Sequence, residues 1–220
     1  NFELPEALIA QYPPQERGES RLMVLNRRNG KIVDAMVSDI ASFIDSGTLM
    51  VFNDSKVRKA RLYGICEQTG ARVEFIFLAP VEQDFAIRIK ERVAQKDGND
   101  SNASALVAPA QRIPSTSRLW RAVCSKARRQ RTGRSYTFPG NMRGSIVEDA
   151  HDEKIIEFSS PLGDDYFDRY GHVPLPPYIK REDTAADEQR YQTVYARQVG
   201  SAASPTAGLH FTPEILSDLR

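Results

Sequence analysis

The sequence lacks acidic residues over one long stretch. Between Ser101 and Val147 there is no Asp or Glu, although the whole chain of 220 residues carries 29 of them and has a formal net charge of +1. The same stretch contains many basic residues, namely Arg112, Arg118, Arg121, Lys126, Arg128, Arg129, Arg131, Arg134 and Arg143. A nearly neutral chain with one basic segment is charge-asymmetric, and such a segment favours a polyanionic partner.

Cysteine and histidine are also scarce. Cys66 and Cys124 lie far apart without CxxC spacing, which excludes a zinc ribbon and a disulfide framework. We expect both to be reduced thiols packed in the interior. His151, His172 and His210 are scattered, so we expect no metal site.

Long apolar runs are missing as well. No segment approaches the roughly 18–20 apolar residues of a membrane helix, and the first residues, Asn-Phe-Glu-Leu-Pro, do not resemble a secretory signal. We therefore expect a cytoplasmic protein without a membrane partner. The composition, 40% hydrophobic and 27% charged, is typical of a globular protein.

Short strands separated by turn residues fill most of the chain before Pro161. Residues 21–25 and 31–37 flank an Asn-Gly pair and predict a hairpin. Residues 39–45 predict a short helix, and the continuous apolar run 48–52 predicts a buried strand. Further strands are predicted at 60–67, 71–78, 85–93, 119–125, 135–138, 144–148 and 154–158, with a long surface loop at 95–117.

These patterns predict an α/β plus all-β fold with two domains. The strand-rich middle, residues 60–159, has the signature of a small antiparallel β-barrel. After Pro161, residues 162–170, 183–199 and 214–220 predict helices, the last with Thr212 as N-cap and Pro213 behind it. Residues 1–59 and 160–220 then form a discontinuous α/β domain into which the barrel is inserted.

The segment from Gly171 to Thr212 is the most distinctive. It reads GHVPLPPYIKRED, then RYQTVYA, then GSAASPTAGLHFT. These three blocks, together with residues 4–25 and 49–64, closely resemble the S-adenosylmethionine:tRNA ribosyltransferase-isomerase family of queuosine biosynthesis. Family members are considerably longer, so the chain looks truncated at its C-terminus and its α/β domain incomplete.

The resemblance implies a particular reaction. The ribosyl part of S-adenosylmethionine, the donor substrate, is transferred to a 7-aminomethyl-7-deazaguanine base at the wobble position of tRNA and isomerised. The product is epoxyqueuosine, and adenine and methionine leave. No metal is implied, and we favour a monomer. The alternative is a catalytically inactive RNA-binding fragment or paralogue of the same family.

His210 is the strongest catalytic candidate, because an imidazole titrates near neutral pH and lies here in a loop of small residues before a helix. Thr206 and Gly208 share this loop, where backbone N–H groups could bind an anion. The alternatives are a histidine that only hydrogen-bonds the loop and an ordinary tight turn.

Other candidates for substrate binding fall into two groups. Asn53, Asp54 and Lys56 follow the predicted strand 48–52, where polar residues commonly line an α/β ligand crevice, and Arg61 follows them. The alternative for this group is a surface turn. The second group surrounds the proline-rich block, where aromatic faces can stack on bases and arginines can pair with phosphates: Tyr178, Arg181, Arg190, Tyr191, Gln192 and Tyr195.

Two tyrosines of that second group have an alternative role. Tyr191 and Tyr195 are spaced to pack on the inner face of a helix. For the basic segment, Arg128, Arg129 and Arg131 cluster at a predicted hairpin tip and are candidate RNA contacts. The alternative for these arginines is a solvated turn.

Overall fold

The computed structural model describes residues 2–81, 116–150 and 152–220. The chain divides into two compact units. We call Arg58–His172 the barrel unit, and Asn1–Val57 with Val173–Arg220 the pocket unit. The predicted strand 85–93 and most of the predicted loop 95–117 lie outside the described residues, and the predicted domain boundaries at 59/60 and 159/160 stay a prediction.

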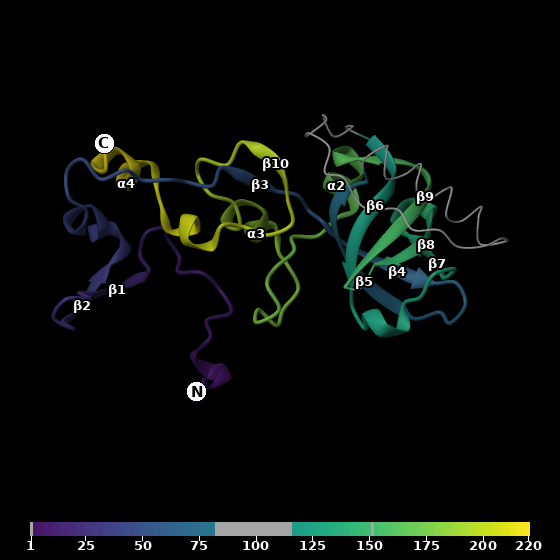
Figure 1. The fold of residues 1–220 in the computed structure, drawn as a ribbon, viewed down its shortest axis with the longest axis horizontal. Coiled ribbons are helices and arrows are strands. Elements are labelled where there is room, and N and C mark those ends of the chain that lie inside the picture. Colours follow the sequence, from purple (N-terminus) through teal and green to yellow (C-terminus); the bar gives the residue numbers. More distant parts are fainter. Residues whose placement is uncertain (1, 82–115, 151) are drawn as a thin grey trace, which may run out of the picture. The chain divides into compact units, whose positions relative to one another are not determined.

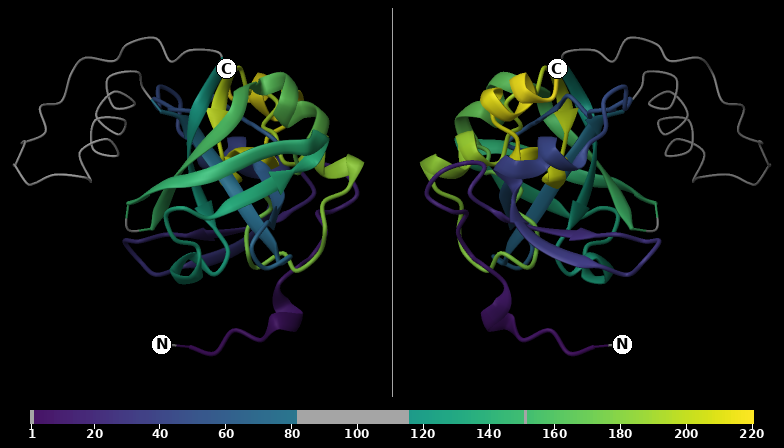
Figure 2. Two further views of the ribbon diagram at one scale, coloured as in Figure 1. Left: turned by 90° about the vertical axis from the view of Figure 1, so that its right-hand side faces the viewer. Right: turned by 90° about the vertical axis from the view of Figure 1, so that its left-hand side faces the viewer.

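Six antiparallel strands close the barrel in the order β4-β5-β6-β9-β8-β7, and β7 pairs back to β4 (Figures 1 and 2). Their bounds are β4 Arg61–Cys66, β5 Arg72–Pro80, β6 Thr116–Cys124, β7 Ser135–Phe138, β8 Met142–Ala150 and β9 Glu153–Gly163. Short 3-10 turns, η3 (Ala127–Arg129) and η4 (Pro139–Asn141), connect some of them, and helix α2 (Asp164–Tyr170) follows β9. The predicted inserted barrel is confirmed.

Aromatic side chains fill the barrel because alternate residues of each strand point inward. Phe75, Phe77, Trp120 and Phe158 are at most 1% exposed. Phe167 of α2 joins this core, with its ring centroid 4.8 Å from that of Trp120. This aromatic cluster is the main core of the unit, and a smaller apolar cluster of Val81, Leu119 and Ile155 lies beside it.

The pocket unit is built from short elements. Strands β1 (Arg21–Leu25) and β2 (Ile32–Met36) form the predicted hairpin, and β3 (Ser55–Val57) pairs in parallel with β10 (Gln198–Ser201). The helical elements are η1 Glu6–Leu8, η2 Val37–Phe43, α3 Ala185–Arg190, η5 Thr206–His210 and α4 Pro213–Asp218. The N-cap prediction for α4 is confirmed, since the Thr212 hydroxyl accepts from the Ile215 N–H at 3.2 Å.

The predicted buried strand 48–52 is wrong. Leu49 and Val51 are each 88% exposed, and no strand of the described residues pairs with this segment. Met50 and Phe52 instead pack on the side of Phe211. An apolar run is buried on both faces only when a sheet flanks it, and here only alternate residues find a partner surface.

The predicted helix 183–199 is correct only for α3, which ends at Arg190. Beyond it the chain turns, and the N–H groups of Arg197 and Gln198 donate to the Asp54 carbonyl at 2.7 and 3.2 Å. These bonds begin the β3–β10 pair. Pairing with a distant strand therefore overrides the local helical spacing.

Candidate functional site

A cavity of about 340 Å³ lies in the pocket unit, at the lower end of the size range of small-molecule sites. Its walls come from three segments: residues 10–20, residues 175–191, and the turn η5, which ends at His210. The structure brings together six of the predicted site residues here, namely Tyr178, Arg181, Arg190, Tyr191, Thr206 and His210.

His210 ends η5 and is exposed at the edge of this cavity. Partial burial and the neighbouring positive charge of Arg17 both lower the pKa of its imidazole below 6.5. A lowered pKa keeps the ring neutral at pH 7, so its free nitrogen can accept a proton. The side chain has the exposure and protonation state of a general base.

Arg17 ties two walls of the cavity together. One guanidinium nitrogen, Nη1, donates to the carbonyls of Gln192 and Leu209, each at 2.9 Å. The other, Nη2, reaches the Gln189 carbonyl at 3.2 Å. These carbonyls belong to the end of α3, to the segment just after it and to η5, so a single side chain joins these elements.

Arg181 is held by a carboxylate rather than left open to a ligand. Its Nη1 and Nη2 atoms donate to the two carboxylate oxygens of Asp187 at 2.6 and 2.8 Å. Asp187 also accepts from the Thr184 N–H and hydroxyl, as the capping box of α3. The Arg181 hydrogen bonds lower the pKa of Asp187 to about 2, in spite of burial. The Arg181 guanidinium stacks over the Tyr12 ring at 4.3 Å and so supports an exposed aromatic face.

Arg190 and Tyr191 follow one another but have different surroundings. Arg190 donates to the carbonyl of Pro14 at 2.9 Å and to that of Gln15 at 3.3 Å, which fixes the N-terminal wall. Tyr191 is 8% exposed and packs against Val57. For this tyrosine the inward-packing alternative describes the structure, although part of its side chain still lines the cavity.

Gln192 lies beside the cavity and completes a sheet edge. Its amide oxygen accepts from the Val57 N–H at 3.0 Å, and its amide nitrogen donates to the Val57 carbonyl at 2.7 Å. The Gln192 amide thus makes the pair of hydrogen bonds with Val57 that a backbone residue of a neighbouring strand would make. Its predicted contact with substrate stays a prediction.

Gly208 and Tyr195 form a tight packing pair. A Cβ atom at Gly208 would lie 2.2 Å from the Tyr195 hydroxyl and 2.7 Å from a Thr193 methyl carbon. The Gly208 N–H is already bonded to the Pro205 carbonyl at 2.8 Å. Glycine is required here for close approach, and burial raises the pKa of Tyr195.

Asn53, Asp54 and Lys56 lie on or before β3, outside the 340 Å³ cavity. The Asn53 side chain accepts from the Ser55 N–H at 2.9 Å, in a local turn. Asp54 pairs with Arg197 at 3.3 Å and lines a separate hollow of about 590 Å³ with Tyr195. Arg61 is buried in the barrel unit, 3.5 Å from Glu74. Their roles in substrate binding stay predictions.

Arg128, Arg129 and Arg131 lie together at and just after η3, in the connection between β6 and β7. All three are exposed. Within the described ranges, no three His, Cys, Asp or Glu side chains are grouped so as to hold a metal ion. In the same residues, no helix is both long and apolar enough to span a bilayer.

Several cavity residues were missed from the sequence, among them Gln11, Tyr12 and Arg17. The available signal was the run YPPQERG, which places a tyrosine, two prolines and an arginine close together as the PLPPYIKR block does. Gln11 binds that block directly, since its side-chain oxygen accepts from the Lys180 N–H at 2.6 Å.

The chain thus combines a closed antiparallel barrel with a second unit that holds a cavity lined by arginines, tyrosines and a histidine. The family model described as queuosine biosynthesis protein matches residues 1–220. The chain belongs to this family, which confirms the resemblance drawn from its motifs.

Two curated relatives carry the name S-adenosylmethionine:tRNA ribosyltransferase-isomerase. The protein from Treponema denticola is 38% identical over 224 residues, which cover 100% of this chain and 55% of the relative. The protein from Borreliella afzelii is 39% identical over 218 residues, covering 99% and 53%. The chain therefore spans about half the length of the curated relatives it matches.

Solved structures match as well, among them the crystal structure of an S-adenosylmethionine tRNA ribosyltransferase from Thermotoga maritima. It is 22% identical, and the match covers 99% of this chain and 52% of that one, with a TM-score of 0.34.

Proposed function

We propose that the protein transfers and isomerises the ribosyl part of S-adenosylmethionine onto a 7-aminomethyl-7-deazaguanine base at the wobble position of tRNA. Epoxyqueuosine in tRNA is the product, and adenine and methionine leave. S-adenosylmethionine is consumed as a substrate, and the reaction takes place in the cytoplasm with its tRNA. The names of the two curated relatives support this assignment.

One observation carries the proposal to this chain. The proline-rich block, the RYQTVYA block and the PTAGLHFT block are separated in sequence, yet residues of all three line the same cavity. A small-molecule site needs convergent polar groups in a mostly apolar pocket. Tyr178 and Tyr191 supply aromatic surface, while Arg190, Thr206 and His210 supply polar groups.

The proposed reaction requires removal of a proton from an amine. Transfer forms a bond between the aminomethyl nitrogen and a carbon of the ribosyl part, while the ribosyl bonds to the sulfonium sulfur and to adenine break and each electron pair goes with its leaving group. The nitrogen loses a proton as it becomes a secondary amine, and adenine takes one up. We assign the neutral His210 imidazole as the group that accepts the proton from nitrogen. Thr206, at the other end of η5, provides a hydroxyl that can hydrogen-bond the substrate.

The remaining cavity residues bind and orient. The exposed Tyr12 and Tyr178 rings offer faces on which a purine-like base can stack. The Arg181 guanidinium stacks on the Tyr12 ring. Arg17 holds two walls of the cavity together through its hydrogen bonds to the Gln192 and Leu209 carbonyls. In this proposal η5 supplies the proton acceptor, and the two proline-rich segments supply the aromatic rings on which the base stacks.

The test is an assay with S-adenosylmethionine and tRNA that carries the deazaguanine precursor, followed by mass spectrometry of the nucleosides. The chain is assayed alone and as a chimera completed by the part of the Treponema denticola relative that it does not cover. We expect epoxyqueuosine as the product of this assay. A His210→Ala variant should form it about 10²–10⁴-fold more slowly. His172→Gln, which changes a histidine of the barrel unit, should stay within about twofold.

No product from either form would contradict the proposal. A His210→Ala variant within about threefold of the parent would contradict the catalytic assignment alone. Binding of tRNA without any turnover would support the alternative of an inactive RNA-binding relative.

A further inference from the structure

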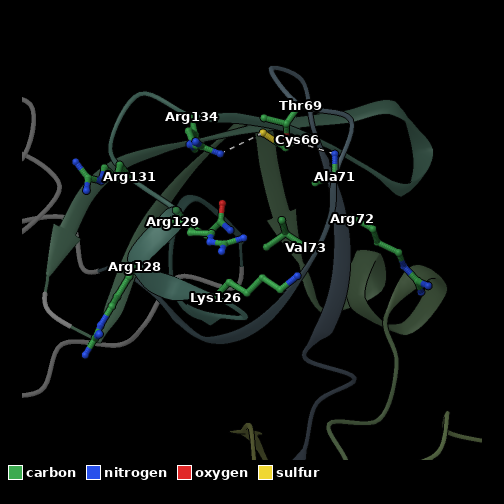
Figure 3. Close-up of a pocket in the computed structure, with 11 residues that line it drawn as sticks. Cys66, Thr69, Ala71, Arg72, Val73, Lys126, Arg128, Arg129, Arg131 and Arg134 are labelled. Atoms are coloured by element: carbon green, nitrogen blue, oxygen red, sulfur yellow. Dashed lines mark hydrogen bonds between the residues drawn. The ribbon is translucent and has the colours of Figure 1, made fainter.

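A second cavity, of about 640 Å³, lies at one end of the barrel, and six of its eleven lining residues are cationic (Figure 3). The turn between β4 and β5 forms one side, and the connection between β6 and β7 forms the other. Of its described lining residues none is Asp or Glu, whereas the cationic members are Arg72, Lys126, Arg128, Arg129, Arg131 and Arg134.

Most of these charges have no ion-pair partner among the described residues. Among the residues that the structure describes, Lys126, Arg128, Arg129 and Arg131 form no ion pair. Other exposed arginines of the same unit are neutralised, since Arg121 pairs with Glu153 at 2.7 Å and Arg143 with Glu67 at 2.8 Å. Elsewhere on the barrel unit carboxylates pair with exposed arginines, whereas four cations at this cavity have no such partner among the described residues.

The local backbone brings the cations close together. Lys126 has a positive φ of 52°, and the tight 3-10 turn η3 follows it directly. Arg134 turns back toward the cavity floor, where its Nη1 is 3.8 Å from the Cys66 sulfur. In Figure 3 Arg134 and Cys66 face each other, whereas Arg128 and Arg131 project outward from the rim. The cavity therefore has one cation, Arg134, at its floor, and the long side chains of Arg128 and Arg131 at its rim.

The Cys66 thiol lies at this cavity. Burial opposes its ionisation, but hydrogen bonds with Thr69 and Gln68, and to a smaller extent the charge of Arg134, lower its pKa. The Cys66 side chain is 1% exposed, so it does not itself offer a reactive group.

The lining fits phosphates and does not fit bases. No aromatic side chain lines the described part of the cavity, so a nucleobase would find no face for stacking. The one amide, Gln130, is buried and accepts from the Tyr136 hydroxyl at 2.7 Å. Burial raises the pKa of Tyr136 to about 12, which keeps this donor protonated. What remains for a ligand is guanidinium and ammonium groups, whose natural partner in nucleic acids is phosphate.

We propose that this cavity binds backbone phosphates of the tRNA substrate and contributes affinity that is independent of base identity. The inference rests on the proposed function, which supplies RNA as the polyanion. It assigns this contact to a unit that holds none of the residues of the 340 Å³ cavity. Contact with the RNA backbone is thereby assigned to the barrel unit, and binding of the reacting groups to the pocket unit.

The test compares two triple variants that change net charge equally. One is Arg128→Ser with Arg129→Ser and Arg131→Ser, at the cavity. The control is Arg121→Ser with Arg143→Ser and Arg169→Ser, all exposed in the barrel unit but outside the cavity. Affinity for an unmodified tRNA transcript is measured by fluorescence anisotropy at several KCl concentrations.

We expect the cavity triple to bind at least about tenfold more weakly near 0.1 M salt, with the slope of log K against log salt reduced by about 2 to 2.7. The control triple should change affinity less than about twofold. Lys126→Gly, which suits a left-handed backbone and so preserves the turn, should reduce the slope by about 0.7–0.9. It keeps the test decisive if the triple variant fails to fold.

Equal losses in both triples would overturn the inference, because they would show a diffuse effect of net charge. Tighter binding of polyglutamate than of the transcript would overturn it in favour of an acidic protein partner. The slope is measured without turnover, so the two proposals fail separately. A reduced slope without any epoxyqueuosine would contradict only the proposed function, and an unchanged slope in an active enzyme only the cavity.

Discussion

The two units are stabilised by different kinds of interaction. The barrel unit has a closed ladder of strands around one aromatic core, in which Phe77 alone contacts five other rings. The pocket unit has short strands and single turns, joined by side chains that bond to distant backbone carbonyls. Arg17 and the Leu209 carbonyl that it binds are 192 residues apart in sequence.

This difference predicts which perturbations each unit resists. Apolar burial has no direction and tolerates changes of charge on the outside. A guanidinium that binds several carbonyls depends on geometry and on having every partner, because a buried polar group without one is costly. The barrel should therefore respond to changes of side-chain volume, and the pocket unit to changes of single polar atoms and of pH.

The largest effect should come from the barrel core. Phe77→Ala removes a fully buried ring and should lower the free energy of unfolding by about 3–5 kcal/mol. The chain has a single tryptophan, Trp120, which lies in this core, so its fluorescence reports on the barrel during urea unfolding. Ile65→Ala, at an exposed position on β4, should cost less than about 0.5 kcal/mol. Similar losses in both variants would show that the core does not dominate.

The next effect should come from the buried ion pair of the pocket unit. Asp187→Asn leaves Arg181 without its carboxylate and weakens the cap of α3, at a cost of about 3 kcal/mol. Hydrogen exchange of α3 should accelerate about a hundredfold, while the Trp120 transition stays in place. Asp218→Asn, an exposed carboxylate on α4, is the control and should leave exchange of α3 unchanged.

The same pair gives a pH dependence with a defined sign. Asp187 has a pKa of about 2 in the folded protein against 3.8 when free, so its stabilising contribution is complete above the higher value. It is lost as the pH falls from there through about 2. The measurement is the protection factor of α3, the exchange rate relative to that of an unstructured amide at the same pH. A protection factor that stays unchanged down to pH 2 would contradict this assignment.

The barrel was the more predictable unit, for the same physical reason that makes it robust. Strand alternation and turns such as Thr69–Gly70, where Gly70 has a φ of 69°, are local and visible in sequence. The pocket unit was predicted less well because its contacts are long-range. The helical spacing after Arg190 is overridden by β3, and no local pattern shows that Arg17 will bind carbonyls near His210.

The candidate site shows the same limit. The resemblance pointed to Thr206, His210 and Arg190 as site candidates, and the structure shows that all three line one cavity. The resemblance could not separate ligand-facing side chains from those that hold the walls. Arg181 and Gln192 bind Asp187 and Val57, which only the structure reveals.

The smallest and most specific effect should come from Arg17, through two separable contributions. Its hydrogen bonds position η5, and its charge helps to lower the pKa of His210 after the effect of burial. Arg17→Lys keeps the charge but loses the forked geometry, whereas Arg17→Gln loses both. Both variants should be slower by about tenfold, close to 1.4 kcal/mol, because catalytic groups tolerate little displacement.

The pH profile separates the two contributions. If neutral His210 accepts the proton, the rate falls as the pH drops through its pKa, which lies below 6.5. Removing the Arg17 charge raises that pKa, so the acidic limb of kcat/KM should move to higher pH in Arg17→Gln and stay in place in Arg17→Lys. An equal shift in both variants would assign the effect to geometry. No shift in either would mean that the limb belongs to another group, and His210 would lose its assignment as the base.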